Sequence, residues 1–120
     1  MGFINPCHRG RAYGDGYMQG EGSIGQLVKV VGDDLFAVNT DSTARSFGIL
    51  IKTYKSGEMP GIYTEGGVYE TDVYEGNIVA GDLLKVSASG KITAGVTAGD
   101  LVIGQALTAK SGTIKFQLHL

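Results

Sequence analysis

One stretch of the sequence alternates strictly between polar and apolar residues: Thr113-Ile114-Lys115-Phe116-Gln117-Leu118-His119-Leu120. Every even-numbered residue in it is apolar and every odd-numbered residue is polar. Because successive side chains of a β-strand point to opposite faces, the pattern predicts a strand with one face in a core and one in solvent. The stretch therefore favours a β-fold.

The preceding sequence repeats this arrangement of short apolar runs between turn residues. The runs predicted to be strands are 27–31, 35–39, 47–54, 62–65, 68–74, 83–87, 91–94 and 101–108. The pair Gly66-Gly67 is predicted to turn a hairpin between two of them. The fold class indicated is all-β, a small single-domain barrel or sandwich of short strands.

Two details support tight packing of these strands. The face carrying Val102, Gly104 and Ala106 is unusually small, which predicts the close approach of another backbone. The tetrapeptide Ala-Gly-Asp-Leu occurs at 80–83 and again at 98–101. Glycine permits unusual backbone angles and aspartate can bond its own backbone, so both copies are predicted to be turns. Two copies are too few for a repeat array.

The composition excludes several classes of protein. A chain of 120 residues has the length of one domain. Its net charge of −2 is not typical of a nucleic-acid-binding protein. The single cysteine, Cys7, cannot form an internal disulfide, and no apolar run approaches the roughly 20 residues of a membrane span. We therefore expect a soluble protein folded in a cytoplasm, with neither nucleic acid nor membrane as partner.

The first 26 residues differ from the rest because glycine recurs every few positions between large side chains. Such interruption predicts no self-supporting structure. We interpret residues 1–26 as an extended Gly-rich N-terminal arm that orders against a partner, and residues 27–120 as the β-domain. A frayed terminus or a loop-rich start to the domain remains an alternative.

Two motifs in this region resemble functional sites but lack the neighbouring residues or elements that such sites need. Residues 20–25 match the letters of a dinucleotide-binding glycine loop, but a Gly-rich segment precedes them and a β-branched run follows. Cys7 and His8 are adjacent, yet the one other histidine is His119, whereas zinc needs three or four ligands. No cofactor and no metal site are predicted.

An acidic stretch leaves more than one interpretation open. Between residues 58 and 76 there are five carboxylates and no basic residue. The simplest interpretation is a solvated face; an interface with a basic partner, such as Arg9 and Arg11 of a neighbouring copy, is a second. A metal site or a carboxylate-based hydrolase using Glu70 and Asp72 is the third, and the sequence does not favour an enzyme.

Several motifs between residues 76 and 107 carry a family resemblance. They are the two Ala-Gly-Asp-Leu turns, the hairpin Ser87-Ala88-Ser89-Gly90-Lys91, and Leu101-Val102-Ile103-Gly104-Gln105-Ala106-Leu107. This run resembles the head-decoration (capsid cement) proteins of tailed bacteriophages. The resemblance covers residues 68–120 well and the first half only in general character.

The resemblance implies a compact β-barrel-like domain of the β-tulip type. It further implies a protein made in the host cytoplasm that binds the outer surface of the assembled head and stabilises it. Such proteins form homotrimers at three-fold and quasi-three-fold positions, with an arm on the major capsid protein. The capsid-binding candidates are Phe3, Ile4, Arg9, Arg11, Tyr13, Tyr17 and Met18. The candidates for inter-subunit contact are Met59, Pro60, Val102, Gly104 and Ala106.

A different part of the virion is the alternative. A head-fibre or receptor-binding β-domain would contact host-surface glycans through tyrosines such as Tyr63, Tyr69 and Tyr74. Glycan binding by the isolated protein would favour this alternative over a cement protein.

Overall fold

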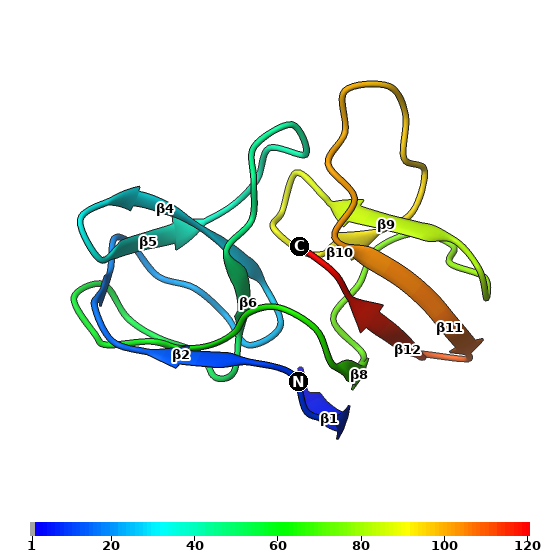
Figure 1. Ribbon diagram of the computed structural model, residues 1–120, viewed down its shortest axis with the longest axis horizontal. Coiled ribbons are helices and arrows are strands. Elements are labelled where there is room, and N and C mark those ends of the chain that lie inside the picture. The colour runs from blue at the N-terminus through cyan, green and yellow to red at the C-terminus, as the bar shows by residue number, and fades with distance from the viewer. Residues whose placement is uncertain (1) are drawn as a thin grey trace.

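Twelve β-strands make up the computed structural model, which describes residues 2–120 (Figure 1). They form two six-stranded sheets. Sheet A contains, in spatial order, β1 (Ile4–His8), β8 (Val68–Thr71), β12 (Thr113–Leu118), β11 (Gly104–Lys110), β9 (Leu83–Val86) and β10 (Ile92–Thr93). Sheet B contains β2 (Ala12–Gly14), β7 (Gly61–Tyr63), β6 (Gly48–Leu50), β4 (Leu27–Gly32), β5 (Leu35–Val38) and β3 (Tyr17–Met18). The all-β prediction is confirmed.

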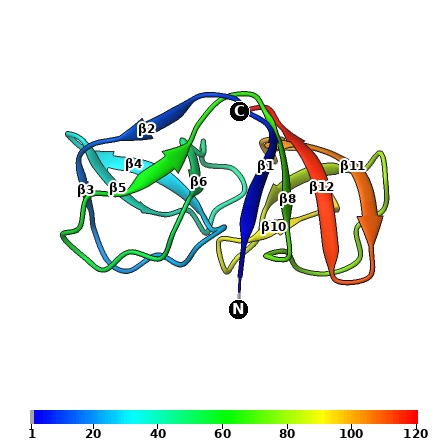
Figure 2. The same cartoon turned by 90° about the horizontal axis from the view of Figure 1, so that it is seen from below.

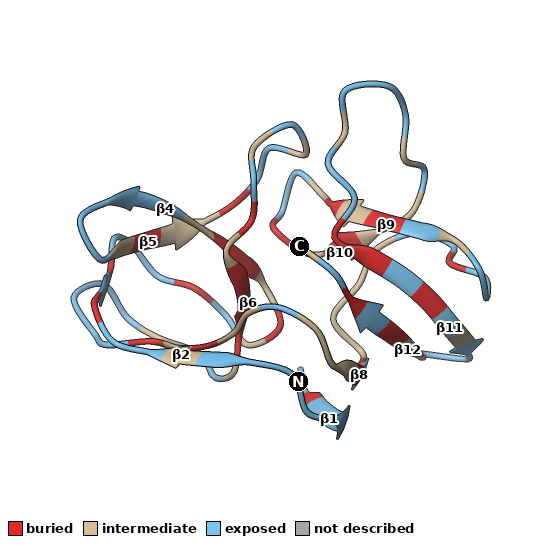
Figure 3. Ribbon diagram, viewed as in Figure 1, coloured by how far each residue is buried: buried red, intermediate tan, exposed pale blue. Residues whose placement is uncertain are grey.

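Neighbouring strands run antiparallel except β3 and β5, which pair in parallel. No helix able to cross a membrane occurs in the part of the chain that the structure describes. The alternation in β12 is confirmed, since Ile114, Phe116 and Leu118 are fully buried while Gln117 is exposed (Figure 3).

The chain crosses between the sheets twice, because β1 and β8–β12 belong to sheet A and β2–β7 belong to sheet B. The two crossings run side by side (Figure 2). The Arg11 amide donates to the Glu65 carbonyl over 2.9 Å, and the Thr64 amide donates to the Arg11 carbonyl over 2.8 Å. Residues 8–12 and 63–68 therefore form a double connection, which we call the waist.

The predicted Gly66-Gly67 hairpin is wrong, because β7 and β8 lie in different sheets. Both glycines have positive φ angles, 76° and 85°, and so they do turn the chain. A glycine pair signals the turn but not whether the flanking strands pair with each other. Here β7 pairs with β2 and β6, while β8 pairs with β1 and β12.

Most predicted strands are longer than the observed ones, and two differ most from the structure in their limits. The run 47–54 supplies only β6, which ends at Leu50, and the chain then turns so that Tyr54 bridges to Gly22. The run 101–108 is strand only from Gly104, since the Leu101 amide bonds to the Ser42 carbonyl of a distant loop. Both differences arise from partners far away in sequence.

The segment interpreted as an arm is paired into both sheets in this structure. It supplies β1, β2 and β3, which pair with β8, β7 and β5. Ile4 and Met18 are buried in the core. Strands of five, three and two residues leave no readable alternation, and their partners lie far along the chain. Met1 lies outside the described residues, and an arm released onto a partner stays a prediction.

One core joins the two sheets. Its larger cluster contains most of the buried side chains of sheet A together with Leu27 of β4 and Ile49 of β6, which belong to sheet B. A smaller cluster lies within sheet B: Met18, Val28, Phe36, Leu50 and Ile62. Because Leu27 and Ile49 pack against sheet A, the two sheets bury their apolar faces together as a single domain.

The close approach predicted for the small face of β11 is confirmed. A Cβ built on Gly104 would lie 2.1 Å from the carbonyl oxygen of Gln117, in the neighbouring strand β12. Ala106, two residues on, is buried on the same strand. The small side chains are therefore required by packing inside the domain.

We predict that Gly104→Ala lowers the free energy of unfolding by about 1–3 kcal/mol, because the added methyl would force β12 to move. Gly14→Ala in β2 is the matched control, since a Cβ there meets no atom within 4 Å. Chemical denaturation would measure both variants. Equal stability of Gly104→Ala and the unaltered protein would contradict this packing.

Candidate functional site

A groove in the surface lies beside the waist. It comprises two adjoining pockets of about 370 Å³ and about 100 Å³, which share Arg45, Ser46 and Leu120. Val30, Phe47, Thr64 and Glu65 line the first, and Leu101, Val102 and Ile103 line the second. We call this feature the waist groove. Its lining is mainly apolar and comes from segments far apart in sequence.

Packing and backbone bonds hold these walls in place. The Phe47 ring packs against Phe36 at 5.0 Å and against Tyr13 at 5.4 Å between centroids. The His119 amide donates to the Ile103 carbonyl over 2.8 Å, which fixes the chain leading to Leu120. The groove is therefore a preformed feature of the fold.

Of the three arginines of the chain, Arg45 and Arg11 lie at or next to the waist groove. Arg45 lines both pockets, and Arg11 bonds through its backbone to the wall residues Thr64 and Glu65. Arg9 precedes Arg11 on the same crossing, and all three side chains are exposed. None of them forms an ion pair within residues 2–120. The rim of the groove is consequently positive.

Glu65, the one carboxylate in the groove wall, is already engaged. Its Oε1 accepts bonds from the Gly66 amide at 2.8 Å and the Leu120 amide at 3.2 Å. His119 Nδ1 lies 3.5 Å from the same oxygen. Glu65 therefore ties residues 119–120 to the waist.

A second surface lies at the far end of sheet B, beside β3 (Figure 2). Tyr17 and Met59 are 62% and 59% exposed there, and the Met18 amide bonds to the Glu58 carbonyl, which joins their two segments. The Tyr17 amide likewise bonds to the Asp34 carbonyl. We call this surface the tip. Its exposed carboxylates are Asp15, Asp33, Asp34 and Glu58.

One tip carboxylate is oriented by a tyrosine. The Tyr13 hydroxyl donates to Asp34 Oδ1 over 2.5 Å. This hydrogen bond, with burial and the nearby negative charge, raises the pKa of Tyr13 to about 12. Tyr13 therefore stays protonated, and able to donate this hydrogen bond, further into the alkaline range than an ordinary tyrosine.

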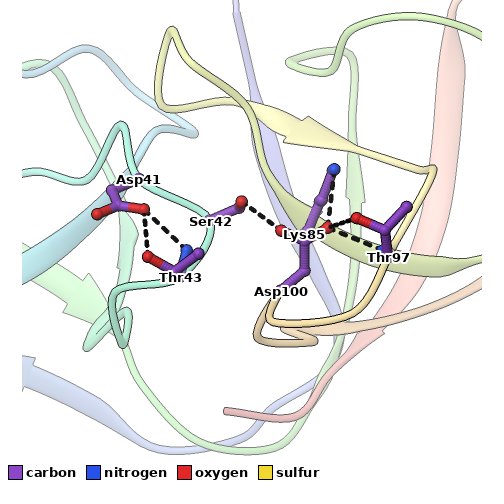
Figure 4. A network of polar contacts seen from close by, with 6 residues as sticks. All are labelled: Asp41, Ser42, Thr43, Lys85, Thr97 and Asp100. Atoms are coloured by element: carbon purple, nitrogen blue, oxygen red, sulfur yellow. Dashed lines mark hydrogen bonds and ion pairs between the residues drawn. The ribbon is translucent and has the colours of Figure 1, made fainter.

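A polar network on Asp100 positions the loop that carries Leu101 and Val102 (Figure 4). Asp100 accepts bonds from Ser42 Oγ over 2.5 Å and Lys85 Nζ over 2.9 Å. It also accepts from the Thr97 amide over 2.8 Å. These bonds, that of Ser42 foremost, lower the pKa of Asp100 well below its ordinary range. The network joins two loops, 40–46 and 95–101.

Both Ala-Gly-Asp-Leu copies are turns, as predicted. Asp82 accepts from the Val79 amide, three residues earlier, just as Asp100 accepts from Thr97. Gly81 and Gly99 have φ angles of 93° and 92°. No local pattern indicates Ser42 as a partner, since it is 58 residues from Asp100.

The structure separates the predicted capsid-binding residues. Ile4 and Met18 belong to the core, and Phe3 and Tyr13 are half-buried. The exposed members are Arg9, Arg11 and Tyr17.

The predicted inter-subunit residues are also dispersed. Met59 is exposed at the tip and Val102 at the waist groove, whereas Pro60, Gly104 and Ala106 are buried within the domain. Sequence reasoning missed the groove residues Val30, Phe47, Leu101 and Leu120, because only the fold brings their segments together.

The acidic stretch does not converge on one site. Glu70 lies opposite Lys115 in the β8–β12 register, and Asp72 Oδ1 accepts from the Phe3 amide over 2.8 Å. Glu75 accepts from the Ser87 and Ser89 hydroxyls, which lower its pKa. Asp72 and Glu75 therefore bond to different segments of the chain, and these three carboxylates share no common site.

The remaining candidate motifs are also separated. Cys7 and His8 are exposed on β1, and within residues 2–120 no three His, Cys, Asp or Glu side chains are grouped to hold a metal. The Tyr69 ring is fully buried and packs on Tyr63 at 4.6 Å between centroids, so Tyr69 offers no face to a glycan.

The fold is similar to a solved structure, the head fibre gp8.5 N base in bacteriophage phi29. The TM-score is 0.65, with 13% sequence identity over 90% of this chain and 92% of that chain. No protein-family model and no curated protein matches the sequence. At 13% sequence identity, this similarity is one of fold alone.

We predict that Asp100→Asn lowers the melting temperature by several degrees at about pH 7, because the folded state loses a carboxylate that it stabilises. A lowered folded-state pKa contributes stability above the ordinary aspartate pKa of about 4 and loses it as the pH falls toward the folded value. The difference in melting temperature between the variant and the unaltered protein should therefore be smaller at about pH 3 than at about pH 7, and smaller still at about pH 2.

Thermal melts across this pH range measure the effect. Asp33→Asn is the control, since Asp33 is exposed and no bond of its side chain is seen. A destabilisation by Asp100→Asn that is independent of pH would show that the charge of Asp100 does not contribute.

Proposed function

We propose that this chain is a structural protein of a bacteriophage head, bound to the outer surface of the assembled capsid through the major capsid protein. The observation that carries the proposal is the fold shared with a head-fibre base over nine-tenths of both chains. The motifs of residues 76–107, which resemble those of head-decoration proteins, support it independently. Both lines of support concern phage heads.

The character of the surface supports a role in protein contact without catalysis. Exposed tyrosine, methionine and arginine are the residues enriched where proteins bind each other. They occur here at the tip and at the rim of the waist groove. Of the two candidate catalytic carboxylates, Asp72 is bonded to the Phe3 amide and Glu70 is exposed opposite Lys115.

Binding to a lattice explains how a small domain can stabilise a shell. A ligand that binds only the assembled state shifts the equilibrium toward that state by mass action. Many symmetric copies, and trimers at three-fold and quasi-three-fold positions, would multiply a modest contact free energy. We propose such a cement role, with a homotrimer as the binding unit.

The second candidate is the anchoring base of a head fibre, which the similar structure favours. A base that binds a capsid subunit equally well whether that subunit is free or assembled would occupy the shell without making it more stable. The two candidates therefore differ in the strength of the shell rather than in its occupancy.

We predict that the purified protein co-sediments with undecorated, expanded heads of its parent phage and reaches saturation. As a cement protein it should also raise the temperature at which the heads release DNA, because it binds only the intact lattice. Saturation without a change in DNA release would favour the fibre base. Heads that stay bare at saturating protein would contradict both candidates.

We also predict that Arg9→Glu weakens binding to heads about tenfold or more, because like charges at a contact oppose association. Arg9 is exposed and, unlike Arg11, has no backbone bond to the groove wall. Lys110→Glu, at the end of β11, carries the same charge change as a control. The melting temperature should be unaltered in both variants, and equal head occupancy would remove Arg9 from the capsid contact.

A further inference from the structure

We propose that the tip of one copy docks in the waist groove of a second copy, so that copies associate head to tail. The inference rests on the proposed homotrimer and specifies its contact. The contact requires the tip and the waist groove to match in shape and charge, and to be placed so that both can bind at once.

The apolar parts of the two surfaces are complementary in form. The tip projects Tyr17 and Met59, which are more than half exposed. The waist groove is a hollow of about 370 Å³ with the apolar side chains Val30, Phe47 and Leu120 in its wall. A tyrosine buries roughly 150–250 Å² when it enters such a site, which is a large share of a small contact. A large apolar side chain in a pocket is the usual centre of a protein interface.

The charges of the two surfaces are opposite and unpaired. The four carboxylates of the tip make no ion pair within residues 2–120, and neither does Arg45 or Arg11 at the groove. Glu65 is one carboxylate in the groove wall, and it accepts amide hydrogen bonds as Asp15 and Glu58 of the tip also do. With two arginines against one carboxylate, the groove is the more basic of the two surfaces and suits an acidic partner.

The positions of the two surfaces define the kind of assembly. The tip lies at the outer end of sheet B, beside β3 (Figure 2), whereas the groove is lined by the waist residues Thr64 and Glu65 together with Leu120. A contact between different surfaces of identical chains is heterologous, and it forms a closed ring or an open filament. In a closed ring of three copies, every tip would be bound and every groove would be occupied. Copies on a shell would then be linked to one another as well as to the capsid.

A charge swap tests this pairing directly. Sedimentation velocity and native mass spectrometry would compare the full chain with Arg45→Glu, with Asp33→Lys and with the double variant. Each single variant should weaken self-association about tenfold or more, because it sets like charges against each other. The double variant should recover association, since its reversed groove meets its own reversed tip. Lys110→Glu should leave association unaltered.

A second pair of variants tests the apolar part of the contact. Met59→Ser should weaken self-association, whereas Val79→Ser should not, although Val79 is 61% exposed and lies near β9 on sheet A. Both residues are on the surface, so neither change should lower the melting temperature appreciably.

The outcomes separate this inference from the proposed function. A chain that stays monomeric at concentrations that saturate heads, or a double variant that does not recover, overturns the tip-to-groove contact. If the double variant does not recover self-association and Arg45→Glu also loses head binding, the groove is a contact for the capsid protein instead. Self-association with the expected swap, but with bare heads, would sustain the contact and overturn the proposed function.

Discussion

The close contact between Gly10 and Gly66 at the waist is the constraint on which the rest of the structure depends. A Cβ on Gly10 would lie 2.4 Å from the carbonyl carbon of Gly66, so the two crossings meet backbone to backbone. Gly67, with its positive φ angle, would place a Cβ 2.7 Å from the Gly10 amide nitrogen. Only glycine allows this approach. It brings the sheets together so that Leu27 and Ile49 of sheet B complete the core of sheet A.

The waist groove is a consequence of the same contact. The crossing residues Thr64 and Glu65 line it, and Glu65 holds the neighbouring lining residue Leu120 through its amide. Arg11 is carried to its position by the partner crossing. The tip, at the other end of sheet B, has no comparable enclosure and presents side chains outward. The fold thus places a basic hollow and an acidic projection on one small molecule.

Local pattern was sufficient to predict some elements. The alternation of β12, the two Ala-Gly-Asp-Leu turns and the small face at Gly104 depend on neighbours in sequence or on one adjacent strand. The strand pairing of the first 26 residues, the destination of the Gly66-Gly67 turn and the lining of the groove depend on contacts between distant segments. A single sequence carries no local signal for such contacts, and glycine hides the alternation that would mark β1 to β3.

The most direct test is a cryo-electron microscopy map of expanded heads saturated with the purified protein. We expect density for three copies around local three-fold positions, with each tip in the waist groove of its neighbour and Arg9 facing the major capsid protein. Shells without added density, or copies that bind singly with their tips and grooves unoccupied, would contradict it.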